Sequence, residues 1–333
     1  MALTAEQLRQ AWGAYYKEGA ITVNNLIKQL YQPTEFKNYF NIRPTKNTAE
    51  DNVRTHLTRV LQKFQPKFTA LGDMSFEPER ILLERVKINV TVTPDELADS
   101  AVQFLIDKGV ERKNMQIIQM MALYLVMKAQ EDDEMDEAWG GVASTIIPTG
   151  TPGAGQTLLG TPTAAGGART GFHKRIKTLN AQSKLKVVSM GDWTNLTNLE
   201  TVEYAKDFYM MMDPLVRQDL KWIAGNETFH LKFMEGMFEK YGKVVDPQFQ
   251  ATGKMNIYGT QCEIRKSRAQ RATKNLWTTP YFNAVGFVKQ PENQAFFAVR
   301  DASFYEVEIG TDWYEVQAIL NSLQVYSNDL EIS

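Results

Sequence analysis

The segment from Gly150 to Thr157 comes closest to a known chemical motif in this chain. Its spacing follows the phosphate-binding loop G-x-x-x-x-G-K-[ST], whose lysine reaches the terminal phosphates of a nucleotide. Gln156 stands at the lysine position, so the charge that the motif supplies is absent. The glycines and Pro162 that follow also oppose the helix whose N-terminus should face the phosphates. The segment therefore predicts a flexible loop and no nucleotide site.

A run of carboxylates is the second candidate, because such groups bind hard cations. On a helix these side chains point outward in all directions, whereas a calcium loop brings them together. We therefore expect a solvated helix end and no metal site. Negative charge near the C-terminal end of a helix opposes its dipole, which suggests a partner of positive charge. The run comprises Glu131, Asp132, Asp133, Glu134, Asp136 and Glu137.

Histidine and cysteine offer little for nucleophilic or metal chemistry. His56, His173 and His230 are scattered, and the single cysteine, Cys262, lies in a strand-like run that predicts a buried thiol. No known Cys/His or serine nucleophile motif is present. The sequence predicts no catalytic site, cofactor or metal, although a pair of carboxylates that meets only in three dimensions stays open.

The densest basic cluster has two interpretations. It could contact DNA or an acidic neighbour, or it could be a solvated loop with internal salt bridges. The second is favoured, because no aromatic residues alternate with the basic ones as they do in single-strand binding grooves. The cluster comprises Arg265, Lys266, Arg268, Arg271 and Lys274.

Bulk properties exclude several classes of protein. The length of 333 residues suggests two domains, or one with large elaborations. A net charge of -2 and a pI near 6.0 argue against a dedicated nucleic-acid binder, whose pI usually exceeds about 9, but leave weak DNA contact open. The start lacks a signal-peptide pattern, and no apolar run is long enough to cross a membrane. A soluble, cytosolic protein is the expectation.

A projecting hairpin is the most distinctive predicted element. Apolar residues alternate from Val86 to Val92, which places them on one face of a strand. We predict strands over Leu57 to Phe68, with Pro66 marking an edge strand, and over Ile81 to Thr93, joined across Gly72 to Pro78. An isolated two-stranded hairpin is marginally stable, so it needs cover from its own body or from another subunit.

A long helix from about Lys113 to Trp139 is predicted to start in a core and to end in solvent. The glycine- and proline-rich composition from Ser144 to Gly171 predicts an extended loop or linker. Further helices are predicted at 5–17, 23–30, 94–108 and 226–241, with one or two in 196–221 interrupted at Asp213-Pro214. Further strands are predicted at 184–190, 255–264, 284–288, 295–299, 304–309 and 314–320.

The order of these parts resembles the major capsid proteins of tailed double-stranded DNA bacteriophages, over roughly Pro33 to Leu323. The run Thr278-Thr-Pro-Tyr-Phe-Asn-Ala-Val-Gly286 is similar to a recurring Thr-Pro-x-x-Asn-Leu-x-x-Gly run in that family, with Ala284 in place of the leucine and the glycine one position earlier. The resemblance implies an α+β fold. Its parts would be an N-terminal arm (1–53), an extended hairpin loop (54–91), a peripheral domain with a long spine helix (92–170), an axial domain (171–243) and return strands (244–333).

The resemblance further implies a structural subunit without catalysis. Copies would form hexamers and pentamers that tile an icosahedral virion shell around packaged DNA, assembled in the host cytoplasm. A scaffolding protein would be a separate chain, and portal and decoration proteins are possible partners. A bacterial compartment shell around enzyme cargo and an unrelated cytosolic enzyme are the alternatives.

Two sets of residues are predicted to serve assembly. On the expected hairpin, the apolar face would pack on an adjacent subunit while Arg85 and Lys87 pair with its acidic residues. The basic cluster, Arg265 to Lys274, would lie at a subunit junction or on the inner surface. The complete hairpin set is Arg85, Val86, Lys87, Ile88 and Val90.

Overall fold

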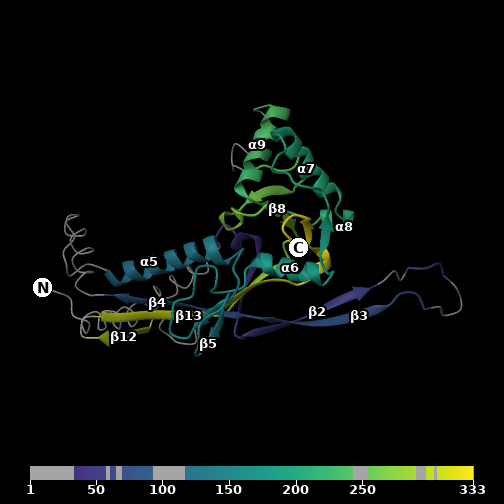
Figure 1. The fold of residues 1–333 in the computed structure, drawn as a ribbon. Coiled ribbons are helices and arrows are strands. Elements are labelled where there is room, and N and C mark those ends of the chain that lie inside the picture. Colours follow the sequence, from purple (N-terminus) through teal and green to yellow (C-terminus); the bar gives the residue numbers. More distant parts are fainter. Residues whose placement is uncertain are drawn as a thin grey trace. The chain divides into compact units, whose positions relative to one another are not determined.

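The computed structural model describes residues 34–57, 61–64, 70–92, 117–242, 254–289, 298–303 and 306–332 (Figure 1). The chain divides into two compact units. Unit 1 comprises Met1–Asn38, Arg85–Lys174 and Gln290–Tyr314, and unit 2 comprises Tyr39–Glu84, Arg175–Lys289 and Glu315–Ser333. The helices predicted at 5–17, 23–30 and 94–108 lie outside the described residues.

Unit 1 contains the long helix predicted from the sequence. Helix α5 (Ile117–Asp132) continues into a π-helical turn, Asp133–Glu137. Strand β4 (Glu84–Val92) and strand β12 (Ala298–Ser303) both pair with β13 (Glu306–Ile319). The stretch predicted as a linker carries a small parallel pair, β5 (Thr145–Ile147) and β6 (Gln156–Leu158), and no helix before α6 (Phe172–Ala181).

Strand β13 is one element where the sequence predicts two, at 304–309 and 314–320. The polar Gly310 to Asp312 suggested a break, yet Gly310 stays in the strand. A Cβ at this position would come within 3.0 Å of Asn89 Oδ1 on β4. A glycine inside a strand commonly marks such a close approach of another chain segment.

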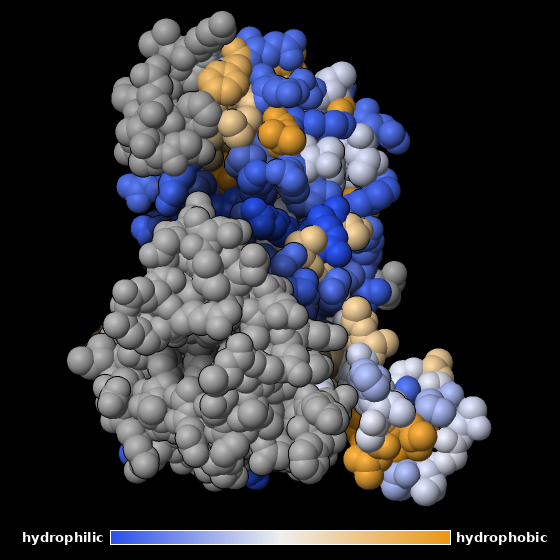
Figure 2. All heavy atoms as spheres, turned by 90° about the vertical axis from the view of Figure 1, so that its left-hand side faces the viewer, coloured by the Kyte–Doolittle hydropathy of each residue, from blue (hydrophilic) through white to orange (hydrophobic). Residues whose placement is uncertain are grey.

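Unit 2 contains a five-stranded sheet in the order β7-β14-β10-β8-β9. Two helices, α7 (Asn198–Met210) and α9 (Glu227–Tyr241), pack on each other, and their apolar side chains share one core cluster with residues of the sheet. The side of this part that Figure 2 shows is mostly hydrophilic. The strands are β7 (Lys186–Val188), β8 (Trp222–Gly225), β9 (Glu263–Lys266), β10 (Trp277–Thr278) and β14 (Tyr326–Asn328).

Local signals set the helix ends of unit 2. Thr197 and Glu200 form a capping box at the start of α7, and Asn226 caps α9 by accepting a hydrogen bond from the Phe229 N–H. Gly242, with φ of 79°, ends α9. The short α8 (Pro214–Arg217) follows the predicted interruption. The predicted helices 196–221 and 226–241 are confirmed.

Unit 2 also contains two strand pairs outside that sheet. The first is β1 (Asn41–Thr45), which pairs in parallel with β11 (Ala284–Lys289). The second is an antiparallel ribbon of β2 (Ala49–Leu57) and β3 (Met74–Leu82). Pro44 within β1 is tolerated because β1 is the last strand of its sheet.

The predicted hairpin was therefore wrong in its strands. The run 81–93 is interrupted at Leu83, whose N–H donates to Thr48 O, and β4 then pairs with β13 instead of with residues 57–68. Pro78, interpreted as a turn residue, lies inside β3 opposite Val53. A two-stranded ribbon has two edges, and an edge strand accommodates a proline that cannot donate a hydrogen bond. Pro66 lies outside the described residues.

Candidate assembly surfaces

The β2–β3 ribbon has one polar and one apolar face. Residues opposite each other in an antiparallel pair share a face, and successive residues alternate between faces. The register places Met74, Phe76, Pro78, Leu82 and Val53 on one face, on which Asp51 lies opposite Arg80 between Leu82 and Pro78. Ser75, Glu77, Glu79 and Ile81 share the other face with Glu50 and Asn52.

The polar face is bonded to the rest of unit 2. Asn52 Nδ2 donates a 2.7 Å hydrogen bond to Leu320 O, and Lys184 Nζ lies 3.2 Å from Glu77 Oε2. Ile81, on the same face, is 6% exposed. Asn52, Glu77 and Ile81 on this face therefore contact the ribbon's own chain.

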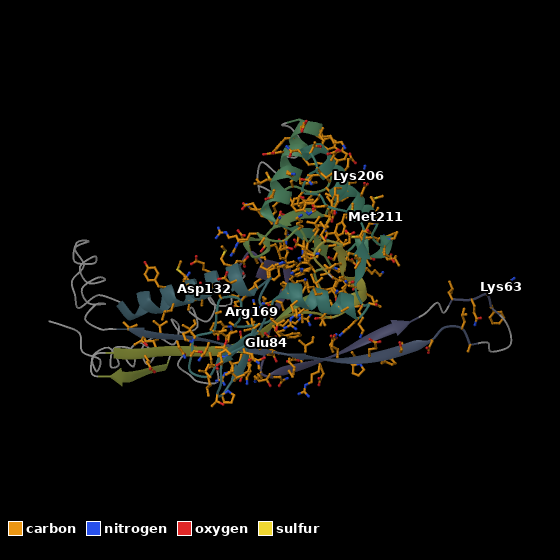
Figure 3. The ribbon with its side chains drawn as sticks, viewed as in Figure 1. Lys63, Glu84, Asp132, Arg169, Lys206 and Met211 are labelled. Atoms are coloured by element: carbon orange, nitrogen blue, oxygen red, sulfur yellow. The ribbon has the colours of Figure 1, made fainter. Side chains whose placement is uncertain are left out.

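The apolar face, by contrast, is in contact with solvent. Val53, Met74, Phe76 and Leu82 expose 58%, 53%, 60% and 61% of their surface. Beyond the paired strands the side chains of Leu61 and Phe64 are 80% and 87% exposed, next to Lys63, which Figure 3 labels. Monomeric proteins rarely expose contiguous apolar surface of this kind, and it usually marks an interaction site.

The predicted contact residues on β4 have a different setting. The predicted alternation is confirmed: Val86 is buried, Ile88 and Val90 are half-buried, and Lys87 is exposed. Because β4 belongs to the sheet with β13, these residues do not lie on the ribbon. Arg85 Nε lies 2.6 Å from Asp312 Oδ2 of the same chain, so at least one of the two basic residues has an internal partner.

The acidic end of α5 is buried, and the prediction of a solvated end was wrong. Asp133, Glu134 and Glu137 are each at most 9% exposed, whereas Glu131 and Asp132 are exposed and lie near Lys128. Asp133 Oδ1 accepts a 2.7 Å hydrogen bond from Arg169 Nε, and its Oδ2 lies 3.0 Å from Lys37 Nζ. The two cations that neutralise Asp133 thus come from distant parts of the sequence.

The two neighbouring carboxylates bind backbone groups. Both Glu134 oxygens accept 3.1 Å hydrogen bonds from the Phe36 N–H. Glu137 accepts from the N–H groups of Gly166, Ala168 and Arg169. The π-helical turn therefore links the segment around Phe36 to the 166–169 loop within unit 1.

The environments of two of these carboxylates shift their pKa values in opposite directions. Burial raises the pKa of Glu137, and the three backbone N–H donors offset only part of that increase. Burial also acts to raise the pKa of Asp133, but the charges of Arg169 and Lys37 outweigh it, and the pKa is lowered. Asp133 is held as an anion between two cations.

Three members of the basic cluster have acidic partners within unit 2. Arg265 Nε lies 2.7 Å from Glu263, Lys266 Nζ 2.5 Å from Glu227, and Lys274 Nζ 2.6 Å from Asp192. Arg268 and Arg271 are exposed in and after a short 3-10 helix, Arg268–Gln270. The predicted internal salt bridges are confirmed for these three pairs, but Arg265 and Lys266 belong to strand β9 and not to a loop.

The Thr-Pro-x-x-Asn run has a structural role. The buried Asn283 donates through Nδ2 to Thr279 Oγ1 and Asn321 O, and its Oδ1 accepts from the Asn321 N–H at 2.6 Å. The Leu320 N–H donates to Asn283 O. This asparagine therefore joins the start of β11 to the end of β13.

Metal ligands do not gather among the described residues. No group of three or more histidine, cysteine or carboxylate side chains with metal-binding geometry occurs among them. Burial raises the pKa of the Cys262 thiol to about 12, so the thiolate nucleophile does not form near neutral pH. Within the same residues, no helix combines the length and apolarity that a bilayer span requires.

Comparisons with known proteins give a match only at the level of three-dimensional structure. No family model matches the chain, and no curated protein matches it. A chain from the procapsid of satellite phage P4, whose structure includes the size determination (Sid) protein, superposes with a TM-score of 0.53 at 9% identity, covering 92% of this chain and 89% of that chain. The chain has the fold of tailed-phage major capsid proteins. The fold class predicted from the order of the parts is confirmed.

Two further capsid structures have TM-scores below 0.5, and the fold assignment does not rest on them. The capsid of Myoviridae phage XM1 matches with a TM-score of 0.49 and 11% identity, covering 89% of this chain and 91% of that one. The structure of Mycobacterium phage Ogopogo matches with a TM-score of 0.47 and 14% identity, covering 88% of this chain and 90% of that one.

Sequence reasoning missed the exposed apolar residues of the β2–β3 ribbon. Val53, Met74, Phe76 and Leu82 were not among the predicted contact residues. A signal was present, because apolar residues stand at alternate positions of 74–82 with only Arg80 breaking the series. The proline within that series led to the interpretation as a turn.

Proposed function

We propose that this chain is the structural subunit of an icosahedral tailed-phage head, which assembles as hexamers and pentamers around packaged double-stranded DNA. The observation that carries the proposal is the outward apolar face of the β2–β3 ribbon in a chain with the capsid fold. A chain that bonds the polar face of a ribbon to itself and leaves the apolar face in solvent needs a partner for that face.

Burial of this apolar face would contribute free energy to assembly. Full burial of a large apolar side chain is worth about 1.5–3 kcal/mol. Covering the exposed half or so of Val53, Met74, Phe76 and Leu82 therefore contributes about 3–7 kcal/mol per contact. Each copy makes this contact again, and head-to-tail contacts that close on themselves form rings.

In this proposal the parts of the chain have the roles expected of the family. The arm is 1–48 and the extended loop is the β2–β3 ribbon at 49–82, in place of the expected 1–53 and 54–91. Residues from β4 to 170 are a peripheral domain with α5 as its spine, 171–243 an axial domain and 244–333 return strands. The particle is a virion capsid assembled in the host cytoplasm. Scaffolding, portal and decoration proteins are separate partners, and DNA is held by weak, non-specific contact.

Strand β4 is a second proposed contact. Lys87 is exposed next to the Arg85–Asp312 pair and is available to an acidic residue of an adjacent subunit. Lys87→Glu should lower the yield of particles. Unchanged assembly would show that β4 does not contact the adjacent subunit.

Negative-stain electron microscopy of the purified protein, with its mass in solution, tests the proposed function. We expect closed shells, or rings of five and six subunits, at low and moderate salt. Particles purified from an infected or expressing cell should contain DNA. Protein cargo instead of DNA would favour a compartment shell, and a monomer of fixed mass even with a co-expressed scaffold would reject the shell function.

A further inference from the structure

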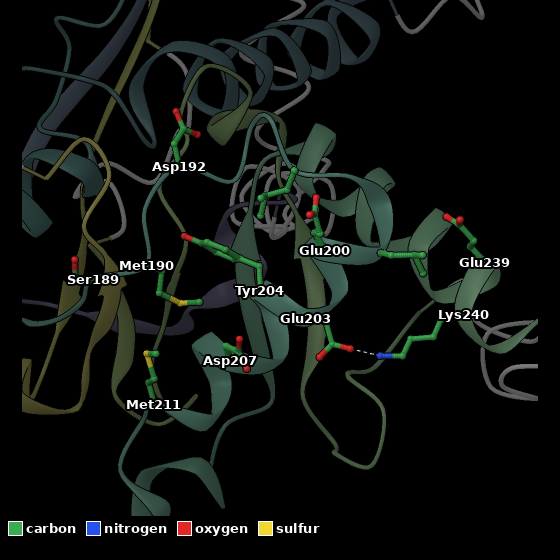
Figure 4. A pocket seen from close by; sticks show the side chains of 12 residues that line it. Ser189, Met190, Asp192, Glu200, Glu203, Tyr204, Asp207, Met211, Glu239 and Lys240 are labelled. Atoms are coloured by element: carbon green, nitrogen blue, oxygen red, sulfur yellow. Dashed lines mark hydrogen bonds and ion pairs between the residues drawn. The ribbon is translucent and has the colours of Figure 1, made fainter.

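An acidic groove lies on unit 2, apart from the ribbon and from β4. It has a volume of about 920 Å³ and lies between α7, the end of α9 and the segment that follows β7 (Figure 4). Met190, Leu196, Leu199, Tyr204 and Met211 give it an apolar lining. Its acidic lining residues are Asp192, Glu200, Glu203, Asp207 and Glu239.

The carboxylates follow one side of α7. Glu200, Glu203 and Asp207 are spaced three and four residues apart, so they share a helix face. The one cation among the lining residues, Lys240, is paired with Glu203. Asp207 and Glu239 are exposed, and no hydrogen bond or ion pair of their side chains occurs within the described residues. The groove thus has an excess of negative charge over an apolar floor.

A basic turn follows strand β9 of the same unit. The order β7-β14-β10-β8-β9 places β7, which leads into the groove, at one edge and β9 at the opposite edge. Directly after β9, the turn from Arg268 to Arg271 presents two exposed arginines. The groove and the turn thus belong to different segments of one unit, and Lys274, three residues after the turn, is paired with Asp192 of the groove lining.

We propose that the acidic groove on α7 of one copy receives the Arg268–Arg271 turn of a second copy. The proposal rests on the proposed function, because it names the contact that joins neighbouring subunits of a ring. A contact between two different, complementary patches of the same unit is head-to-tail, and it repeats until the ring closes. The aliphatic stems of the arginines cover the apolar floor while their guanidinium groups meet the carboxylates. DNA is a poor occupant, because carboxylates repel phosphates.

Charge reversal on either side tests the pairing. Asp207→Lys with Glu239→Lys places lysines opposite the arginines, and we expect at least about a tenfold loss of rings and shells at 0.1 M salt. Arg268→Glu with Arg271→Glu should cause the same loss. Asp219→Lys is the matched control, because Asp219 is an exposed carboxylate of unit 2 outside the groove, and it should assemble like the wild type. Thermal unfolding establishes that each variant is folded.

Mixing the two reversed variants separates this contact from a general effect of charge. In an equimolar mixture every groove can meet an oppositely charged turn if the two variants alternate around a ring. Six-membered rings should therefore reappear, while five-membered rings, which cannot alternate, stay depleted. A single chain with both reversals should recover both kinds of ring.

The outcomes distinguish the inference from the proposed function. If the wild type forms no rings or shells, the proposed function itself fails. If the wild type assembles and the reversed variants also assemble, or if they fail and mixing restores nothing, the groove does not receive the turn, and the shell function stands without this contact.

Discussion

The β2–β3 ribbon and the π-helical end of α5 both reverse the usual distribution of polar and apolar groups. At the end of α5, Asp133, Glu134 and Glu137 are inside, and cations and backbone N–H groups of the same chain satisfy them. On the ribbon, Phe76 and its neighbours are outside, and no described residue of the chain covers them. The first reversal is completed within one chain, whereas the second requires another molecule.

This difference separates the determinants of folding from those of assembly. Removing a partner from a buried, satisfied charge leaves an uncompensated group in a low-dielectric interior and destabilises the subunit. Replacing an exposed apolar side chain leaves the subunit intact and removes area only from a contact that forms later. Mutations in the two regions should therefore affect two different measurements.

The largest effect is expected for Phe76→Asp on the ribbon. A carboxylate in the centre of the apolar face would have to be desolvated in the subunit contact, so particles should be absent or at least about a hundredfold fewer. Sedimentation velocity measures the fraction assembled, and the unfolding midpoint should not change. Ser75→Asp, on the opposite face of the same strand, is the control and should assemble. Equal loss in both variants would contradict the assignment of the faces.

Asp133→Asn should be the most destabilising of the conservative changes in unit 1. It leaves Arg169 and Lys37 buried without their anionic partner, which costs about 3–5 kcal/mol. Urea unfolding of the purified protein measures this loss. Asp132→Asn, one residue earlier and exposed, should leave the midpoint unchanged. Equal midpoints for the two variants would mean that the buried network does not stabilise the subunit.

The dependence of stability on pH should differ in sign between Asp133 and Glu137. The lowered pKa of Asp133 gives a contribution that is present above pH 3.8 and is lost as the pH falls through the folded-state pKa. The raised pKa of Glu137 gives a contribution that is present below pH 4.5 and is lost as the pH rises through its folded-state pKa.

Glu137→Gln cannot ionise, so its stability relative to the wild type should improve as the pH rises from 4 to 7. Urea unfolding at a series of pH values follows this difference. A difference that is constant over the whole range would contradict the burial assigned to Glu137.

The smallest effect is expected for Lys128→Met. Lys128 lies 3.1 Å from Glu131 and 3.0 Å from Asp132, but all three side chains are more than half exposed. Water and salt screen such pairs, so the unfolding midpoint should stay within experimental error. A clearly lower unfolding midpoint would show that the exposed turn of α5 stabilises the subunit as the buried turn does.

The sequence predicted those elements whose signals are local. The helix at 226–241 and the break at Asp213-Pro214 each depend on a few neighbouring residues, and the structure confirms them. Strand partners are not local. The register that pairs Val53 with Pro78 depends on which strands of the fold meet. The alternation of 86–92 fits a sheet with β13 as well as it fits a hairpin.

The acidic end of α5 was misjudged for a similar reason. A run of carboxylates predicts solvent unless cations and N–H donors surround it, and those donors come from elsewhere in the chain. Phe36 is 98 residues from Glu134, and Arg169 is 36 residues from Asp133. The contact residues on the ribbon were missed because a proline was given more weight than the alternation around it.

Oxidative footprinting of Met74 tests the central claim most directly. Met74 lies on the apolar face of the ribbon and is 53% exposed in the single chain. Mass spectrometry would compare its oxidation rate in unassembled subunits and in purified particles of the same protein. If a second copy covers this face, the oxidation rate of Met74 should fall at least about tenfold in particles. A tenfold ratio corresponds to a free-energy difference of about 1.4 kcal/mol. An unchanged rate in closed particles would show that the ribbon is not the subunit contact.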